Sequence, residues 1–284
     1  MRALLCALSL VTAAHAAPIK VLLIDGQNNH AWKTTTPLIE KILEENGLCA
    51  VDVSTAPAKG GDWAAWQPKF ADYAVVVSNY NGELWPETVR ADFEKYVNGG
   101  GGFVAVHAAN NSFPEWLAYN RMIGLGGWGG RNEKSGPLLR LREGKWTADT
   151  SAGNAGHHGK QHEFALTTRA PEHPIMAGLP AKWMHRQDEL YDQLRGPAEN
   201  VTVLASALSA KETGGSGEEE PLLMAIPFGK GRVFHTALGH GTEAVQCVGF
   251  AVTLQRGTEW AATGKVTQKV PADFPGESAA KARP

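Results

Sequence analysis

The stretch FVAVHAA, at residues 103–109, decides the fold. Four consecutive apolar residues are typical of a short strand that is buried on both faces of a parallel sheet. His107 follows them directly, and the small side chains of Ala108 and Ala109 suit a tight turn from strand into helix. Open α/β enzymes place a nucleophile on such a turn. A histidine there cannot form the acyl-enzyme of serine or cysteine, but it can bind a metal or act as a base. The alternative is a structural histidine that is satisfied by a backbone carbonyl.

Similar strands alternate with helices through the first half of the chain. Strands are predicted at residues 19–24, 49–53, 73–78 and 103–106, and helices begin at Thr36-Pro37 and at Pro86. Short alternation of this kind predicts an α/β fold with a mostly parallel sheet and helices on both faces. Residues 124–161 form a long polar, glycine-rich excursion. Further strands are predicted at 164–166, 201–204, 222–226 and 233–236, and a last helix from Glu243 to Arg256.

Polar side chains follow several of these strands. His30 follows the first strand, Asn79 and Asn81 follow the third, and His107 and His240 follow the fourth and the last. The carboxyl ends of parallel strands meet at one rim of the sheet, where such folds bind ligands. We therefore expect His107 and His240 to lie on the same face, within reach of one ion or sugar. Asn79 and Asn81 are predicted to contact a substrate there.

An acidic pair and a histidine cluster are further candidates. Asp188 and Glu189 would face opposite sides of a strand, so only one points easily into a site, and we favour Glu189. A carboxylate beside neutral imidazoles would balance the charge of a bound ion. His158 and His162 have metal-ligand spacing only on a helix, which Gly159 disfavours, so they are predicted to contact substrate instead. Asp188 is likewise predicted to contact substrate.

Composition and one weak motif exclude several functions. The 284 residues carry 27 Lys and Arg against 29 Asp and Glu, a net charge of −2, which argues against a nucleic-acid partner. Gly124, Gly126 and Gly129 match G-x-G-x-x-G, but the motif does not follow a strand, so we reject a nucleotide cofactor. After the first dozen residues there is no apolar run of about 18 residues that would span a membrane.

The N-terminus has the order of a secretory signal peptide. Arg2 precedes an apolar run, and Ala14-His15-Ala16 offers a small-x-small cleavage site. This predicts a signal peptide at 1–17, an α/β domain at 18–265, a polar C-terminal tail at 266–284, and a periplasmic or secreted protein. Cys49 and Cys247 would remain, and we expect both to be free and buried, although an oxidising compartment permits a disulfide.

Seven ordered segments resemble the ThuA-like, or trehalose-utilisation-like, family across residues 19–265. They are Gly102–Ala109 (GFVAVHAA), His173-Pro174-Ile175, Gly178-Leu179-Pro180, Asp188–Tyr191 (DELY), Gly229–Phe234 (GKGRVF), Leu238-Gly239-His240 and Arg256–Trp260 (RGTEW). The resemblance implies a flavodoxin-like fold similar to class I glutamine amidotransferases. In this sequence His107 occupies the position of the nucleophilic cysteine of those enzymes. The chain therefore departs from the pattern that glutaminase chemistry requires. The polar site that the resemblance implies consists of His30, His107, His162, Glu189 and His240.

The resemblance also implies a carbohydrate substrate, through the family's link to trehalose and 3-keto-sugars. We therefore expect an exported protein that acts on a glycoside or 3-keto-sugar by metal-assisted hydrolysis, elimination or isomerisation. His107, Glu189 and His240 are the predicted catalytic groups and the predicted ligands of a divalent metal, zinc or similar, while His30 is predicted to contact substrate. The rivals are a non-catalytic carbohydrate-binding protein and a scaffold for protein contacts. The sequence leaves open whether the protein forms a homo-oligomer.

Overall fold

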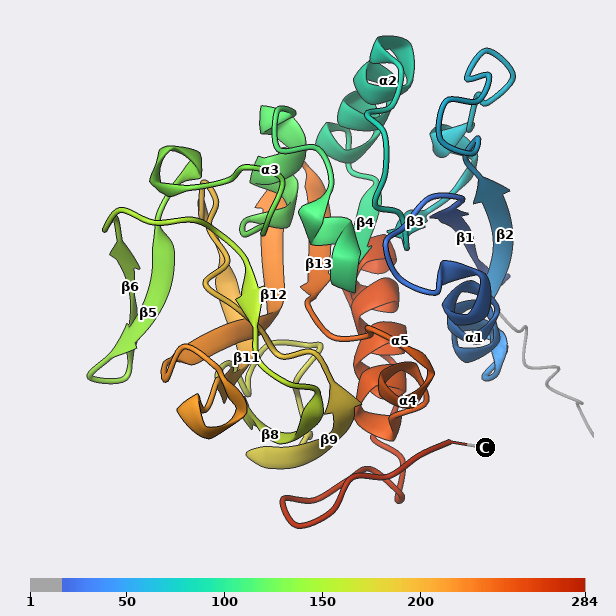
Figure 1. Cartoon of the computed structure of the whole chain (residues 1–284). Coiled ribbons are helices and arrows are strands. Elements are labelled where there is room, and N and C mark those ends of the chain that lie inside the picture. Colours follow the sequence, from blue (N-terminus) through green and yellow to red (C-terminus); the bar gives the residue numbers. More distant parts are fainter. Residues whose placement is uncertain (1–16, 284) are drawn as a thin grey trace, which may run out of the picture.

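A nine-stranded sheet is the centre of the fold (Figure 1). The structure is a computed structural model, and it describes residues 17–283. The predicted signal peptide thus lies, except for Ala17, outside the described residues. The strand order in the sheet is β2-β1-β3-β4-β13-β12-β11-β8-β9.

The first five strands in this order form a parallel half, as the alternating pattern predicts. They are β1 (Ile19–Asp25), β2 (Cys49–Thr55), β3 (Val75–Ser78), β4 (Gly102–Val106) and β13 (Gly231–Thr236). All four pairings among them are parallel. Every residue of β3 and β4 is buried, which explains their unbroken apolar sequences. The order 2-1-3-4-13 is that of a flavodoxin-like sheet.

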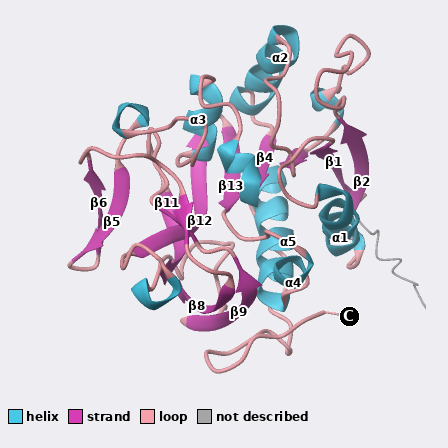
Figure 2. Cartoon of the chain, in the orientation of Figure 1, coloured by secondary structure: helices cyan, strands magenta, loops and turns pink. Residues whose placement is uncertain are grey.

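The other four strands extend the sheet as an antiparallel half. They are β12 (Glu219–Phe228), β11 (Thr202–Leu208), β8 (His162–Thr168) and β9 (Lys182–Asp188). Each pairs antiparallel with its neighbour, beginning with β12 on β13. Two small antiparallel ribbons are separate from this sheet. One pairs β5 (Leu138–Arg142) with β6 (Lys145–Asp149) and lies at the left in Figure 2. The other pairs β7 (His157–His158) with β10 (Tyr191–Asp192).

Helices cover both faces of the parallel half. Phe234 of β13 packs against Gly257 of α5 (Val248–Thr263), where a Cβ atom would lie 2.1 Å from the phenyl ring. Phe103 of β4 points to the opposite face, because Val104 is the residue paired with Phe234. The Phe103 ring contacts α2 (Glu87–Asn98) through Phe93 and α3 (Leu117–Ile123) through Tyr119. The predicted two-faced α/β architecture is confirmed.

Two helix boundaries differ from the prediction. The helix expected at 243–256 is two helices, α4 (Thr242–Val245) and α5, because Cys247 between them is extended and its backbone bridges to Ala282. Helix α1 (Trp32–Glu44) begins before Pro37, which lies just after its first turn and removes only one main-chain hydrogen bond. None of the helices in residues 17–283 combines the length and the apolar composition that a membrane span needs.

The C-terminal segment at 265–283, most of the predicted tail, packs along β9 and the start of α5. The Gly276 carbonyl accepts a hydrogen bond from the Met184 amide, and the Lys281 carbonyl accepts one from the Val248 amide. The Phe274 ring lies 5.7 Å from the Trp183 ring. Cys49 and Cys247 are both free and buried, as predicted.

A candidate metal centre at the rim of the sheet

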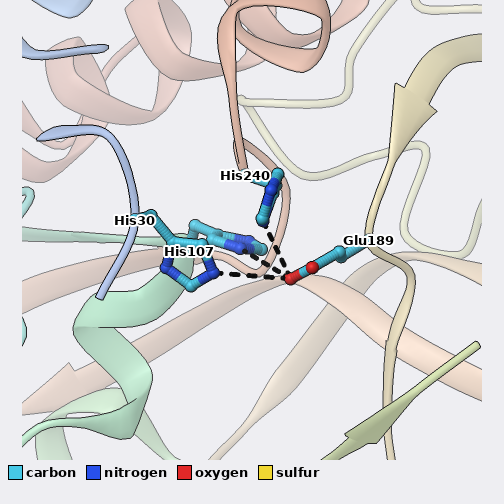
Figure 3. A group of neighbouring side chains, drawn as sticks. All are labelled: His30, His107, Glu189 and His240. Atoms are coloured by element: carbon cyan, nitrogen blue, oxygen red, sulfur yellow. Dashed lines mark ion pairs between the residues drawn. The ribbon is translucent and has the colours of Figure 1, made fainter. Parts of the chain in front are cut away.

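Three histidines and one glutamate meet above the carboxyl ends of the strands (Figure 3). His30 follows β1, His107 follows β4 and His240 follows β13. Glu189 comes from the antiparallel half, directly after β9. One nitrogen or oxygen from each of the four lies within 4.8 Å of all the others. The expectation that His107 and His240 share one face is confirmed, since their ring centroids are 5.6 Å apart.

His107 is held rigidly in a strained backbone conformation. Its φ is +46°, in the left-handed region that few residues other than glycine adopt. The ring stacks on Tyr191 with centroids 4.2 Å apart, and its Nδ1 lies 2.8 Å from the Ala237 carbonyl oxygen. A carbonyl only accepts, so Nδ1 carries the donated hydrogen and Nε2 keeps its lone pair. That Nε2 is buried with no hydrogen-bond partner in residues 17–283, and it lies 3.6 Å from Glu189 Oε2.

The other two imidazoles are aimed at the same oxygen. His30 Nε2 lies 3.5 Å from Glu189 Oε2, and its Nδ1 lies 3.2 Å from the Asn28 side-chain oxygen. His240 presents Nδ1 instead, 2.9 Å from Glu189 Oε2. Burial lowers the pKa of His30, whereas the hydrogen bond to Glu189 raises the pKa of His240. His30 is therefore favoured in the neutral form that binds metals.

Glu189 is the charge that balances these rings. Burial alone would raise its pKa, but the neighbouring imidazoles of His107, His240 and His30 outweigh burial and hold the pKa far below its usual range. Its second oxygen, Oε1, lies 3.6 Å from Nε2 of His158. Glu189 is therefore ionised in the folded protein. One of its oxygens faces the three imidazoles and the other faces His158.

Asp188, the residue before Glu189, connects the segment after β9 with the loop after β13 through hydrogen bonds beneath the four-residue centre. Its Oδ1 accepts hydrogen bonds from the amides of Glu189 (2.8 Å) and His240 (3.0 Å). Its Oδ2 accepts from the Gly239 amide and is 2.8 Å from His185 Nε2. The side chains of Asp188 and His185 are fully buried, and the His185 ring also interacts with the Cys247 thiol. This buried cluster, Asp188–His185–Cys247, fixes Glu189 relative to His240.

A polar cavity of about 580 Å³ opens over the centre. The β7–β10 ribbon forms one wall, because it pairs His158 with Tyr191. Trp128 packs edge-on against the Tyr191 ring, with centroids 4.6 Å apart. The lining residues are Asn29, His30, Asn81, Asn111, Trp128, Gly129, His158, Glu189, Tyr191 and His240.

The four-residue centre has the chemistry of a metal site. Three imidazoles and one carboxylate are nitrogen and oxygen donors that suit zinc and similar divalent ions. His107 and His30 each donate their other ring nitrogen to an oxygen, which is how ligating histidines are oriented in metalloproteins. The buried Nε2 of His107, which has no hydrogen-bond partner among the described residues, is the observation that most directly indicates a ligand-binding site.

A protein-family model described as ThuA, trehalose utilisation, matches residues 20–261 of the chain. This chain belongs to the ThuA family. Its membership gives it a carbohydrate-related function at the level that the family's description states. No curated protein matches the chain in sequence.

Solved structures of other ThuA-like proteins agree with the fold. One from Parabacteroides merdae is 50% identical with a TM-score of 0.92, and the match covers 94% of this chain and 98% of that one. Another from Bacteroides uniformis is 20% identical with a TM-score of 0.63, covering 91% and 97%. Together with the strand order, the likeness places this ThuA-family chain in the glutamine amidotransferase-like fold.

The cavity includes some of the predicted substrate contacts and not others. His30, Asn81 and His158 line it, and His30 lies close enough to Glu189 to join the metal-ligand set. Asn79 is buried beneath the rim and donates to the hydroxyls of Thr35 and Thr36. Asp188 is fully buried, as described. His162 lies in β8 outside the cavity, with its Nδ1 at 2.8 Å from the Lys160 carbonyl.

Sequence reasoning did not assign Asn29, Asn111 and Tyr191 to the site of this ThuA-family protein. Asn29 immediately precedes His30, so its position after the first strand was an available signal. Tyr191 lies two residues after Glu189. Trp128 also lines the cavity, whereas Trp85 and Trp116 are buried in the core.

Proposed function

We propose that this protein is an exported, metal-dependent enzyme that acts on a glycoside or 3-keto-sugar by hydrolysis, elimination or isomerisation. The observation that carries the proposal is the convergence of His30, His107 and His240 on one oxygen of Glu189. The family's carbohydrate-related function supplies the substrate class. Export rests on the N-terminal order of a basic residue, an apolar run and a small-residue cleavage site.

The metal would be held by the three imidazoles and the Glu189 carboxylate. A divalent ion in such a site supplies Lewis-acid polarisation of a carbonyl oxygen, or lowers the pKa of a bound water. The protein's own contribution is rigidity, because Asp188 fixes the two loops that carry Glu189 and His240. A preorganised site of this kind loses little free energy to reordering when a ligand binds.

His158 is placed to accept a proton beside this centre. Its Nδ1 lies 2.8 Å from the Gly159 carbonyl, so Nε2 has the lone pair and lies on the cavity side, near Glu189 Oε1. The side chain is 37% exposed, which lets a substrate hydroxyl or a C–H bond next to a carbonyl approach it. We therefore assign His158 the role of general base.

The remaining lining residues fit a sugar ring. Asn81 and Asn111 have amide groups that both donate to and accept from hydroxyls. Trp128 and Tyr191 offer aromatic surface with a polar edge, and such surface packs against the apolar face of a ring. The cavity volume lies within the range of small-molecule sites.

Three measurements test the proposal. Metal analysis of protein purified from its natural host should find about one divalent ion per chain, and a metal-stripped sample should regain turnover of a 3-keto-glucoside when zinc is restored. His158→Gln should bind zinc as the wild type does and lose most turnover. Zinc binding and sugar binding without any turnover would instead show a carbohydrate-binding protein.

A further inference from the structure

We propose that a second hollow next to the metal cavity is a subsite for the second ring of a two-ring glycoside. This inference rests on the proposed function, because the reacting ring would occupy the metal cavity. The hollow has a volume of about 650 Å³ and is lined by segments that follow β1, β2 and β3. Loops at this crossover point of a flavodoxin-like sheet are where such folds bind ligands.

The two hollows are joined at a pair of asparagines. Asn29 and Asn81 line both, and Asn81 Nδ2 donates to Asn29 Oδ1 at 2.6 Å. The pair therefore lies at the shared border of the two hollows. A ligand that occupies both must extend across this border, so the border would lie near the bond between two rings.

The second hollow has a fixed frame. Gln27 Nε2 donates to the Pro57 carbonyl at 2.7 Å, and Gln27 Oε1 accepts from the Glu83 amide at 3.0 Å. The Glu83 carboxylate in turn accepts from the Gly60 amide at 2.9 Å. These bonds connect all three lining loops. A hollow with such cross-links is present before a ligand arrives, which reduces the ordering cost of binding.

Its lining suits a sugar ring. Trp32, the first residue of α1, is half-buried and offers an aromatic surface. Lys33 lies with its ammonium 5.6 Å from the centre of that ring, and Lys59 lines the same hollow. Neither lysine forms an ion pair with a carboxylate within residues 17–283, so both can donate to hydroxyl or ring oxygens. The substrate class is thus a disaccharide or a glycoside with a ring-shaped aglycone.

The test compares a two-ring and a one-ring ligand by calorimetry on the zinc-loaded protein. The probes are trehalose oxidised to the ketone at one C3, and 3-keto-glucose. Wild-type protein should bind the disaccharide at least about tenfold more tightly, an effect that a stacked ring can supply. Trp32→Ala should remove that difference and leave the affinities for 3-keto-glucose and for zinc unchanged. Trp63→Ala, a tryptophan outside both hollows, is the matched control.

A second variant covers the case in which Trp32→Ala does not fold. Ala58 is exposed and lines the second hollow, so Ala58→Trp should block it and lower only the disaccharide affinity. Equal affinity of wild-type protein for the two probes would overturn the subsite and leave the metal centre standing. Failure to bind zinc would overturn the proposed function itself. Binding of neither sugar to zinc-loaded protein would overturn both.

Discussion

Asp188 and Glu189 are adjacent in the chain, yet they serve two clusters of opposite character. Glu189 belongs to the cluster at the cavity, where three ring nitrogens face its carboxylate and His107 Nε2 has no hydrogen-bond partner among the described residues. Asp188 belongs to the buried cluster, where its two oxygens take part in four hydrogen bonds. The two carboxylates differ in the same way: Asp188 uses both oxygens in hydrogen bonds that hold two loops together, whereas Glu189 faces ring nitrogens that are available to a ligand.

The same contrast separates two kinds of histidine. His185 has 0% of its side chain exposed and lies between Asp188 and Cys247. Burial opposes its protonation, but the neighbouring Cys247 and Asp188 outweigh burial and raise the pKa of His185. The imidazoles of His30 and His240 instead reach the cavity. The predictions below separate the two clusters by reading metal affinity and stability independently.

Removing a metal ligand should have the largest effect. His107→Ala and His240→Ala should each weaken zinc binding by about 100-fold or more, beyond the effect of losing an outer contact, and abolish turnover. Both proteins should remain folded, with about 1 kcal/mol lost in His107→Ala through its bond to Ala237. Calorimetric zinc titration and chemical denaturation measure the two effects. His162→Ala, a histidine outside the cavity, is the control, and wild-type zinc affinity in the two ligand variants would contradict the shared site.

Glu189→Gln keeps the shape of the side chain and removes its charge. We expect zinc affinity to fall by about 10- to 100-fold, because the carboxylate balances the charge of an ion held by neutral imidazoles. The melting temperature without metal should fall less than in the Asp188 variant below, since Glu189 lies at the cavity wall, although its lowered pKa means that the ionised carboxylate contributes some stability at neutral pH. A large loss of stability with unchanged zinc affinity would contradict this prediction, because it would make Glu189 a structural residue rather than a metal ligand.

Asp188→Asn should show the opposite profile. The new amide would place a donor among buried N–H groups, so unfolding should become easier by about 2–4 kcal/mol. Zinc affinity should fall by only about tenfold, because the loops of Glu189 and His240 are held less firmly. Denaturation curves with and without zinc would show whether saturating metal restores part of the stability. If zinc affinity fell as far as in His107→Ala, Asp188 would have to be counted with the ligands.

The smallest effect is expected from the cysteines. Burial raises the pKa of Cys49 to about 12, and Cys247, although its contact with His185 lowers its pKa to about 7, is buried behind Asp188. A Cys49→Ser, Cys247→Ser double variant should keep its turnover and lose about 1 kcal/mol of stability. Turnover assays on the folded variant check this. Complete inactivity would bring back a thiol mechanism.

The parallel half of the fold and its histidines could be predicted because their geometry is local. A short apolar strand that ends at His107 fixes where the imidazole lies, and all parallel strands end at the same rim. His30 and His240 follow by the same rule. The hydrophobic pattern alone does not predict that the last helix is divided at Cys247, because this division depends on pairing with Ala282 far along the chain.

The other wall of the cavity depends on contacts that no local pattern specifies. Tyr191 reaches the site because the β7–β10 ribbon pairs it with His158 across more than thirty residues. The sequence predicts Asp188 as a substrate contact, although the alternation of a strand favours only Glu189 as the residue that points into the site. The four hydrogen bonds of Asp188 come from β9 and from the loop after β13. Strand β9 is the last in the sheet order, four positions from β13, so this meeting is a long-range contact that the sheet order alone does not give.

The C-terminal segment at 265–283 has a consequence for aggregation. Strand β9 is the last strand of the sheet, and an uncovered last strand is a template on which a second chain can add. The segment lies along it through the Met184–Gly276 hydrogen bond and the Trp183–Phe274 contact, and Lys182 adds an ion pair with Glu277. A chain shortened at Pro271 would keep all four residues of the metal centre while uncovering the main-chain edge of β9 at Met184 and the ring of Trp183 beside it. This truncation should therefore lower solubility and leave zinc affinity unchanged.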